Sequence, residues 1–133
     1  MKEIIGNLLK KENVRQNLSS LRQEIKDENA LAEALKLLAG EDELLVSFMG
    51  SDDAKTRKNA ALLIGDLHMS QLSDEVFKAY EGEQMRFVKG SYLAALSQLD
   101  CKELLPQLME RAKELEHMTV TVENRKHIEE ELN

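Results

Sequence analysis

Apolar residues recur along this chain at the three- and four-residue spacing of an amphipathic helix. The clearest stripe lies in residues 53–67, where Ala60, Leu63, Ile64 and Leu67 fall at i, i+3, i+4 and i+7. Similar spacing, interrupted by turn residues, predicts further helices. These cover residues 2–10, 12–26, 28–39, 41–49, 72–81, 83–99, 101–116 and 123–132. Runs of β-branched residues are nearly absent, so the expected fold class is all-α.

Three of these helices share one pattern, which indicates an internal repeat. Aligning Arg57 with Lys89, and again with Arg15, superposes the apolar stripes of the helices that contain them. The matched positions are 42 and then 32 residues apart, and the longer interval holds the additional helix at residues 28–39. Periods of this length are typical of stacked helical arrays. We therefore expect a unit of short helix, tight turn and longer helix, repeated about four times.

Small and turn-forming residues indicate where the helices meet and end. The small residues around Gly65 leave room for a neighbouring helix to approach closely. Gly40 stands where a left-handed C-terminal cap is expected. Ser51 or Asp52 is expected to cap the helix at residues 53–67. Pro106 is expected to kink the helix that follows Asp100, or to delay its start.

The chain resembles the HEAT-repeat family in its short, HEAT-like form. An Asp ahead of an Arg, paired alanines and the run Ile64-Gly65-Asp66-Leu67 carry the resemblance, together with Leu104-Leu105-Pro106. It implies a right-handed α–α superhelix of about four HEAT-like helical pairs, with the second helix of each pair on a concave binding face. Independently, the length of the chain and the lack of a low-complexity linker predict a single domain over residues 1–133. The expected inner helices are 12–26, 53–67, 83–99 and 123–132.

A narrower resemblance is carried by residues 51–61 and 87–93. These runs are similar to the N-terminal HEAT-like region of some Firmicute proteins that continue into an S-adenosylmethionine-dependent RNA methyltransferase domain. This chain has no glycine-rich cofactor loop and no strand–helix alternation. The resemblance therefore implies a docking or substrate-positioning module, and we expect neither a bound cofactor nor catalysis by this chain.

Composition and charge narrow the function classes. Of 133 residues, 42% are hydrophobic and 32% charged, and the net charge is −7. A field of this sign repels phosphate, so contact with nucleic acid would need a local basic patch. A lone cysteine, Cys101, excludes an internal disulfide and fits a reducing cytoplasm, where we expect the protein to be located. No apolar run is long enough for a membrane span.

Seven basic residues on the predicted inner helices are the candidate binding residues. They are Arg15, Arg22, Lys55, Arg57, Lys58, Arg86 and Lys89. In one interpretation they form a row on the concave face that binds a partner or its phosphates. In the other they form a ladder of ion pairs with acids near the preceding turns, such as Asp53 and Glu83. Acids stand beside nearly every one of these cations, which favours the ladder.

Other chemistry-bearing residues lack a functional arrangement. His68, His117 and His127 do not have the spacing of zinc ligands. Cys101 has acidic neighbours, which disfavour a reactive thiolate, and no His–Asp arrangement accompanies it. Phe87 lies off the main stripe, and we favour a core position over an exposed one that stacks nucleobases. We therefore expect no catalytic, cofactor or metal site, and no small-molecule substrate.

Taken together, these observations favour a non-catalytic binding or scaffold module. Its expected partner is another protein or an attached catalytic domain, and no membrane contact is expected. The alternative is an RNA-positioning module of an S-adenosylmethionine-dependent RNA methyltransferase.

Overall fold

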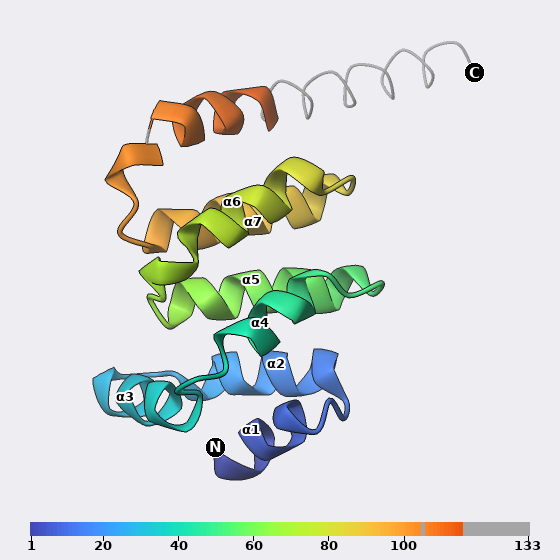
Figure 1. Ribbon diagram of the computed structural model, residues 1–133, viewed down its shortest axis with the longest axis vertical. Helices are drawn as coiled ribbons and strands as arrows, with labels where there is room; N and C mark the ends of the chain where they lie inside the picture. Colours follow the sequence, from blue (N-terminus) through green and yellow to red (C-terminus); the bar gives the residue numbers. More distant parts are fainter. Residues whose placement is uncertain (105, 116–133) are drawn as a thin grey trace, which may run out of the picture. The chain divides into compact units, whose positions relative to one another are not determined.

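The computed structural model describes residues 1–104 and 106–115, and within them every regular element is a helix (Figure 1). The α-helices are α1 (Lys2–Leu9), α2 (Val14–Glu24), α3 (Glu28–Leu37), α4 (Asp42–Met49), α5 (Ala54–Asp66), α6 (Ser73–Gly82) and α7 (Arg86–Gln98). Short 3₁₀ turns cover Ser70–Leu72 and Lys102–Leu104, and residues 106–115 are helical. The expectation of an all-α protein is confirmed.

The chain divides into two compact units, Met1–Cys101 and Lys102–Asn133. The expectation of a single domain over residues 1–133 stays a prediction. In the described part of the second unit, residues 102–104 form a 3₁₀ turn and residues 106–115 are helical, so Pro106 stands in the first turn of this helix. This confirms a delayed helix start, because proline is tolerated in a first turn but not in a helix interior. The predicted helix at 123–132 lies outside the described residues.

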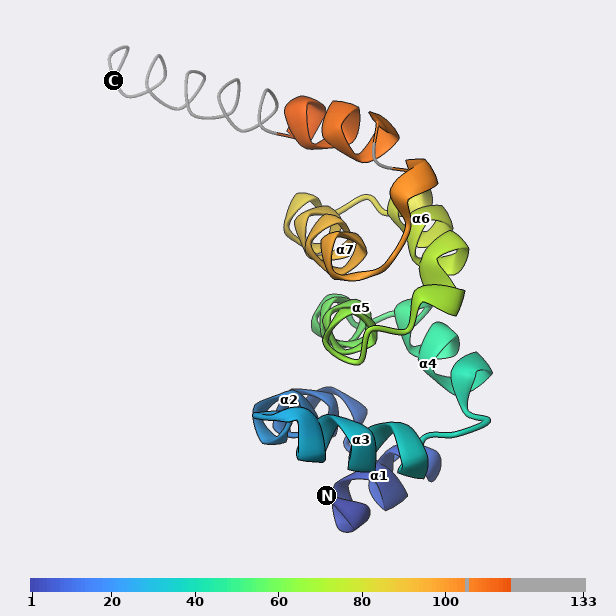
Figure 2. The ribbon, with the colours of Figure 1, turned by 90° about the vertical axis from the view of Figure 1, so that its left-hand side faces the viewer.

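The first unit is built in two layers. Helices α2, α5 and α7 stack on one another and form the α2–α5–α7 layer, which Figure 2 shows as one column. Helices α4 and α6 form the α4–α6 layer, in which α4 packs on α5 and α6 packs on α7. Helix α1 packs against α2. Each short helix thus packs against the longer helix that follows it, with α3 as an addition between α2 and α4.

The contact between α5 and α7 is the most extensive in the stack, and Gly65 permits a close approach of the two helices there. A Cβ atom at Gly65 would lie 2.8 Å from the Cα of Ala95. The predicted stripe of α5 is buried, and so are its α7 counterparts Tyr92 and Leu96. The prediction that small residues permit a close helix approach here is confirmed.

The helix ends confirm the left-handed cap expected at Gly40, correct one other expected cap, and add a cap at Asp27. Asp27 accepts a hydrogen bond from the Ala30 amide at the start of α3, and Gly40 has a φ of +83°. The expected cap of α5 was wrong by one or two residues. Asp53, and not Ser51 or Asp52, accepts the hydrogen bond from the Thr56 amide at 3.0 Å.

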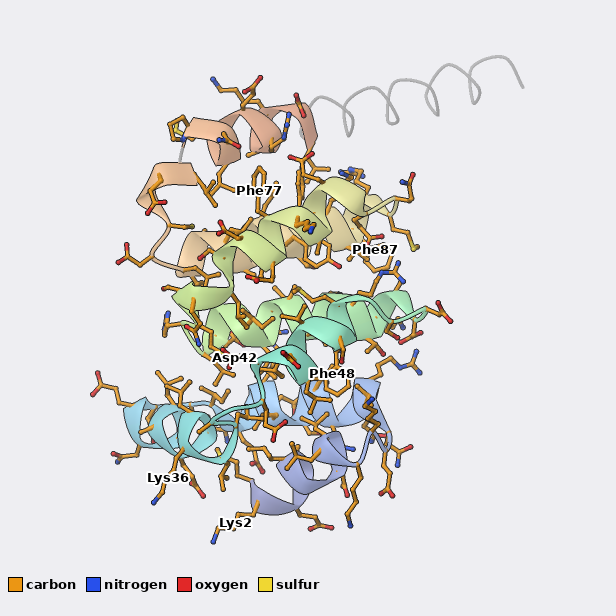
Figure 3. All side chains as sticks on the ribbon, in the orientation of Figure 1. Lys2, Lys36, Asp42, Phe48, Phe77 and Phe87 are labelled. Carbon is orange, nitrogen blue, oxygen red and sulfur yellow. The ribbon has the colours of Figure 1, made fainter. Side chains whose placement is uncertain are left out.

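Two apolar residues at the start of α7 are not in the core. Phe87, labelled in Figure 3, is 48% exposed, and Met85 is 42% exposed. The preference for a core position of Phe87 was therefore wrong, and Met85 does not continue the buried stripe of α7. The stripe begins at Val88, one residue after Phe87.

Candidate functional site

An ion pair between Arg57 and Glu83 is the centre of the candidate site. Arg57 lies in the first turn of α5, and Glu83 is the residue that follows α6. The Arg57 Nε and Nη2 atoms donate to the Glu83 carboxylate at 2.9 and 3.1 Å. Such a two-point contact fixes the orientation of both groups. The Arg57 side chain is 17% exposed and that of Glu83 is 5% exposed, so the pair is largely withdrawn from water.

Further hydrogen bonds extend this pair into a cluster that joins four segments of the chain. Glu83 Oε1 accepts from the amides of Gln84 and Met85, both at 3.1 Å. The Tyr92 hydroxyl of α7 lies 3.3 Å from Glu83 Oε2 and donates to it. The Arg57 Nη1 atom donates to the carbonyls of residues 51 and 52, at 2.9 and 3.2 Å. The cluster therefore holds α5, α7 and the two loops that precede them in one arrangement.

The surroundings give each group of the cluster one charge state near neutral pH. Burial raises the pKa of Glu83, but the hydrogen bonds and charge of Arg57 and the donated amides outweigh it, so the pKa is lowered. The hydrogen bond to Glu83 raises the pKa of Arg57. Burial, together with the nearby Glu83 charge, raises the pKa of Tyr92 to about 12. Arg57 is therefore a cation, Glu83 a carboxylate and Tyr92 a neutral phenol.

A groove of about 620 Å³ lies beside this cluster. Its walls come from the C-terminal half of α4, from α6, from the α6–α7 loop, and from single residues of α5 and α7. The apolar lining residues are Val46, Met49, Gly50, Ala79, Gly82, Met85 and Tyr92. The charged ones are Arg57, Glu75, Lys78 and Glu83. Its volume is in the range of ligand pockets in proteins, and a mainly apolar lining with a few fixed polar groups is typical of such pockets.

The seven cations singled out from the sequence all lie in the α2–α5–α7 layer, but they differ in their surroundings. Arg15 pairs with Asp53 at 3.7 Å, with both side chains about half exposed, and Arg22 pairs with Asp66 at 2.7 Å. Lys89 donates to the Tyr80 carbonyl at 3.1 Å and lies 4.3 Å from the Tyr80 ring centroid. Among the seven, only Arg57 lines the groove.

The remaining three of the seven are Lys55 and Arg86, which are exposed, and Lys58, which is partly exposed. A phosphate- or partner-binding role for this row stays a prediction. Two of the observed ion pairs share one arrangement, and the sequence had suggested the partner acids but not this arrangement. Arg15 and Arg57 each bind an acid in the turn before the next longer helix, and not one in the turn before their own.

The two layers carry opposite charge. Helices α2, α5 and α7 contain seven basic and two acidic residues. Helices α4 and α6 contain five acidic residues and one basic residue. The acids are Asp42, Glu43, Asp74, Glu75 and Glu81, and the single cation is Lys78. The groove opens between α4 and α6, so its surroundings are acidic although the neighbouring layer is basic.

Other candidate groups do not assemble into a site. Cys101 is buried, and its thiol donates to the Leu96 carbonyl at 3.3 Å. His68 has a φ of +52°, and its Nδ1 lies 3.1 Å from the Gln98 carbonyl. Residues 1–104 and 106–115 hold no group of three or more side chains suited to a metal ion. His117 and His127 lie outside the described residues.

Sequence reasoning identified Arg57 and named Glu83 among its candidate partners, but it missed the groove. The missed residues are the groove-lining residues of α4, α6 and the α6–α7 loop. Their apolar side chains were expected to be buried in the core. One feature of the sequence could have indicated the groove. Met85 directly precedes Arg86 at the start of a helix, ahead of the apolar stripe, which is a position where a methionine can be exposed.

Comparison with protein-family models, with curated proteins and with solved structures gives no match for this chain. Across the part of the chain that the structure describes, no helix is long and apolar enough to cross a bilayer.

Proposed function

We propose that this chain is a non-catalytic helical-repeat module that binds a segment of another protein in the groove between α4 and α6. The observation that carries this proposal is the groove itself. It combines an apolar lining with a rigid polar cluster, and it presents the 42% exposed side chain of Met85. Methionine side chains adapt to different apolar partners, which suits a surface that binds protein.

The arrangement of helices supports a HEAT-like superhelix as the scaffold. The pairs α1 with α2, α4 with α5, and α6 with α7 repeat one packing, and their longer helices stack. Stacked repeats of this kind present extended binding surfaces. We propose that these pairs are three of the four HEAT-like units expected from the sequence.

The groove offers a direct test through Gly82. A Cβ atom at Gly82 would meet no atom within 4 Å, so tryptophan can replace this glycine and fill the groove without a backbone clash. Gly6 in α1 has the same open surroundings and lies away from the groove, so Gly6→Trp is the matched control.

A library of peptides displayed on phage would be selected against the wild type, and the enriched peptides titrated against both variants. We expect Gly82→Trp to weaken their binding at least about tenfold, because it occupies the space of an apolar anchor. Gly6→Trp should leave binding unchanged. Equal affinity for the wild type and Gly82→Trp would contradict the proposal.

A second candidate function is an RNA-positioning module, attached to a methyltransferase domain, and the basic α2–α5–α7 layer favours it. At least four of its seven cations are held in intramolecular contacts, by Asp53, Asp66, Glu83 and the Tyr80 carbonyl and ring. This leaves less charge for phosphate, so the protein-binding function is preferred. A titration with unmodified tRNA over a range of salt concentrations tests the alternative, since phosphate binding weakens steeply with salt.

A further inference from the structure

We infer that the partner segment is a short cationic amphipathic helix, whose apolar face enters the groove and whose Lys or Arg residues contact the acidic α4–α6 layer. This inference rests on the proposed function and specifies the chemistry of the partner. It joins two independent observations, which are the apolar lining of the groove and the charge of the helices that border it.

The groove borders determine the sign of the partner charge. On α6, Glu75 lines the groove, and Asp74 and Glu81 are exposed on the same helix. On α4, Glu43 is exposed and stands three residues before Val46, so the two side chains share a helix face. Lys78 is the only cation of the two helices. A partner with Lys or Arg beside its apolar anchors meets complementary charge, and an acidic partner or RNA meets repulsion.

The charged pair inside the groove does not change this balance. The Arg57 guanidinium and the Glu83 carboxylate neutralise each other, and both are held by further hydrogen bonds. The field at the groove mouth therefore comes from the acids of α4 and α6, offset in part by Lys78, which also lines the groove. Because the surrounding water screens these charges, they contribute to partner choice and association rate more than to affinity.

The shape of the groove determines the partner conformation. Every regular element in residues 1–104 and 106–115 is helical, so this region offers no sheet edge that could pair with an extended strand. A groove bordered by two helices accepts an amphipathic helix through anchors at i, i+3 or i+4, and i+7. Helix α4 has 8 residues and α6 has 10. These helices are about 12 and 15 Å long, which matches two to three turns of a bound helix.

The test uses three fluorescently labelled peptides of about 16 residues, long enough for two to three turns of bound helix. The first has leucine on one helical face and lysine on the other, the second replaces every lysine by glutamate, and the third replaces the leucines by serine. We expect the first peptide to bind at least about tenfold more tightly than the others at low salt, and to lose affinity as salt increases.

Two matched charge-reversal variants of the protein distinguish attraction of the peptide to the groove from attraction to the net charge of the protein. Glu75→Lys reverses a charge at the groove, and Glu33→Lys makes the same change at an exposed position of α3 away from it. We expect Glu75→Lys to weaken the lysine peptide about fivefold and Glu33→Lys to have less than half of that effect. Equal effects of the two variants would overturn the inference, because they would indicate attraction to net charge alone.

The outcomes distinguish the inference from the proposed function. If the lysine and glutamate peptides bind equally and both lose affinity in Gly82→Trp, the groove binds protein but the cationic preference is wrong. If the selected peptides and all three designed peptides bind Gly82→Trp and the wild type with equal affinity, both the inference and the groove proposal fail. Dimerisation of the wild type that Gly82→Trp abolishes would assign the groove to a second copy and overturn the inference. Tighter binding of an RNA oligonucleotide than of the lysine peptide at the groove would also overturn it.

Discussion

Replacing Glu83 by glutamine tests the cluster that shapes the groove. The change removes one charge from a pair whose side chains are 5% and 17% exposed, and it nearly preserves side-chain size. Removing one partner of a buried ion pair costs about 3–5 kcal/mol, since the other charge is left without compensation. Here the glutamine oxygen can still accept from the backbone amides, and Arg57 keeps its two carbonyl partners. We therefore expect a loss of about 2–3 kcal/mol in the free energy of unfolding.

Urea denaturation at pH 7, followed by far-ultraviolet circular dichroism, measures this loss. The matched control is Arg15→Gln, which breaks the pair with Asp53 whose side chains are 57% and 47% exposed. An exposed pair of this kind contributes little, so this control should lose less than about 0.5 kcal/mol. Both variants must keep the helical signal of the wild type for the comparison to count.

A double-mutant cycle isolates the interaction itself. Arg57→Met combined with Glu83→Gln removes both charges, so the double variant should be more stable than the sum of the single losses predicts, by about 1–2 kcal/mol. A Glu83→Gln loss no larger than that of Arg15→Gln would refute the reasoning, because the pair would then behave as a surface contact.

Three further predictions concern pH, packing and capping. The lowered pKa of Glu83 means that its stabilisation is complete above the unfolded value near 4.5 and is lost as pH falls through the folded value. The stabilities of wild type and Glu83→Gln should therefore converge below pH 4.5 in urea titrations, whereas a constant difference would contradict this sign. Gly65→Ala should lower the free energy of unfolding by about 1–2 kcal/mol in thermal denaturation, because the new Cβ would lie 2.8 Å from the Cα of Ala95. Gly82→Ala is the control and should not be destabilising, because a Cβ there meets open space. Asp27→Ala should lose about 1 kcal/mol and speed amide exchange in α3, since the cap at Ala30 is removed; unchanged exchange would argue against this cap.

The helices themselves were predictable because each long helix carries an apolar stripe of the right period. The α5 stripe and the small Gly65 pointed to a close helix neighbour, and the structure supplies one in α7. Helix starts were harder. Met85 and Phe87 are apolar, but they stand at the start of α7, where a single helical turn is too short to show which side of the helix is buried. Both are exposed.

The groove was not predictable, because it depends on how far apart two helices lie. Its lining runs along α6 from Glu75 to Gly82 and meets α4 at Val46 and Met49, and no spacing in the sequence shows where such a gap forms. Similarly, Asp53 and Glu83 were both reasonable partners for Arg57 in sequence. The stacking of α5 on α7 brings Glu83 to 2.9 Å, while Asp53 caps α5 and contacts Arg15. Distances of this kind follow from packing and not from spacing along the chain.

The most direct test of the groove as a protein-binding site is methyl NMR of the methionines. Met49 and Met85 line the groove, while Met69 is buried elsewhere and Met109 is exposed in the second unit. With the ε-methyl groups labelled with carbon-13, the lysine peptide should shift the signals of Met49 and Met85. It should leave those of Met69 and Met109 in place. Binding of the peptide with no change at Met85 would contradict the central claim.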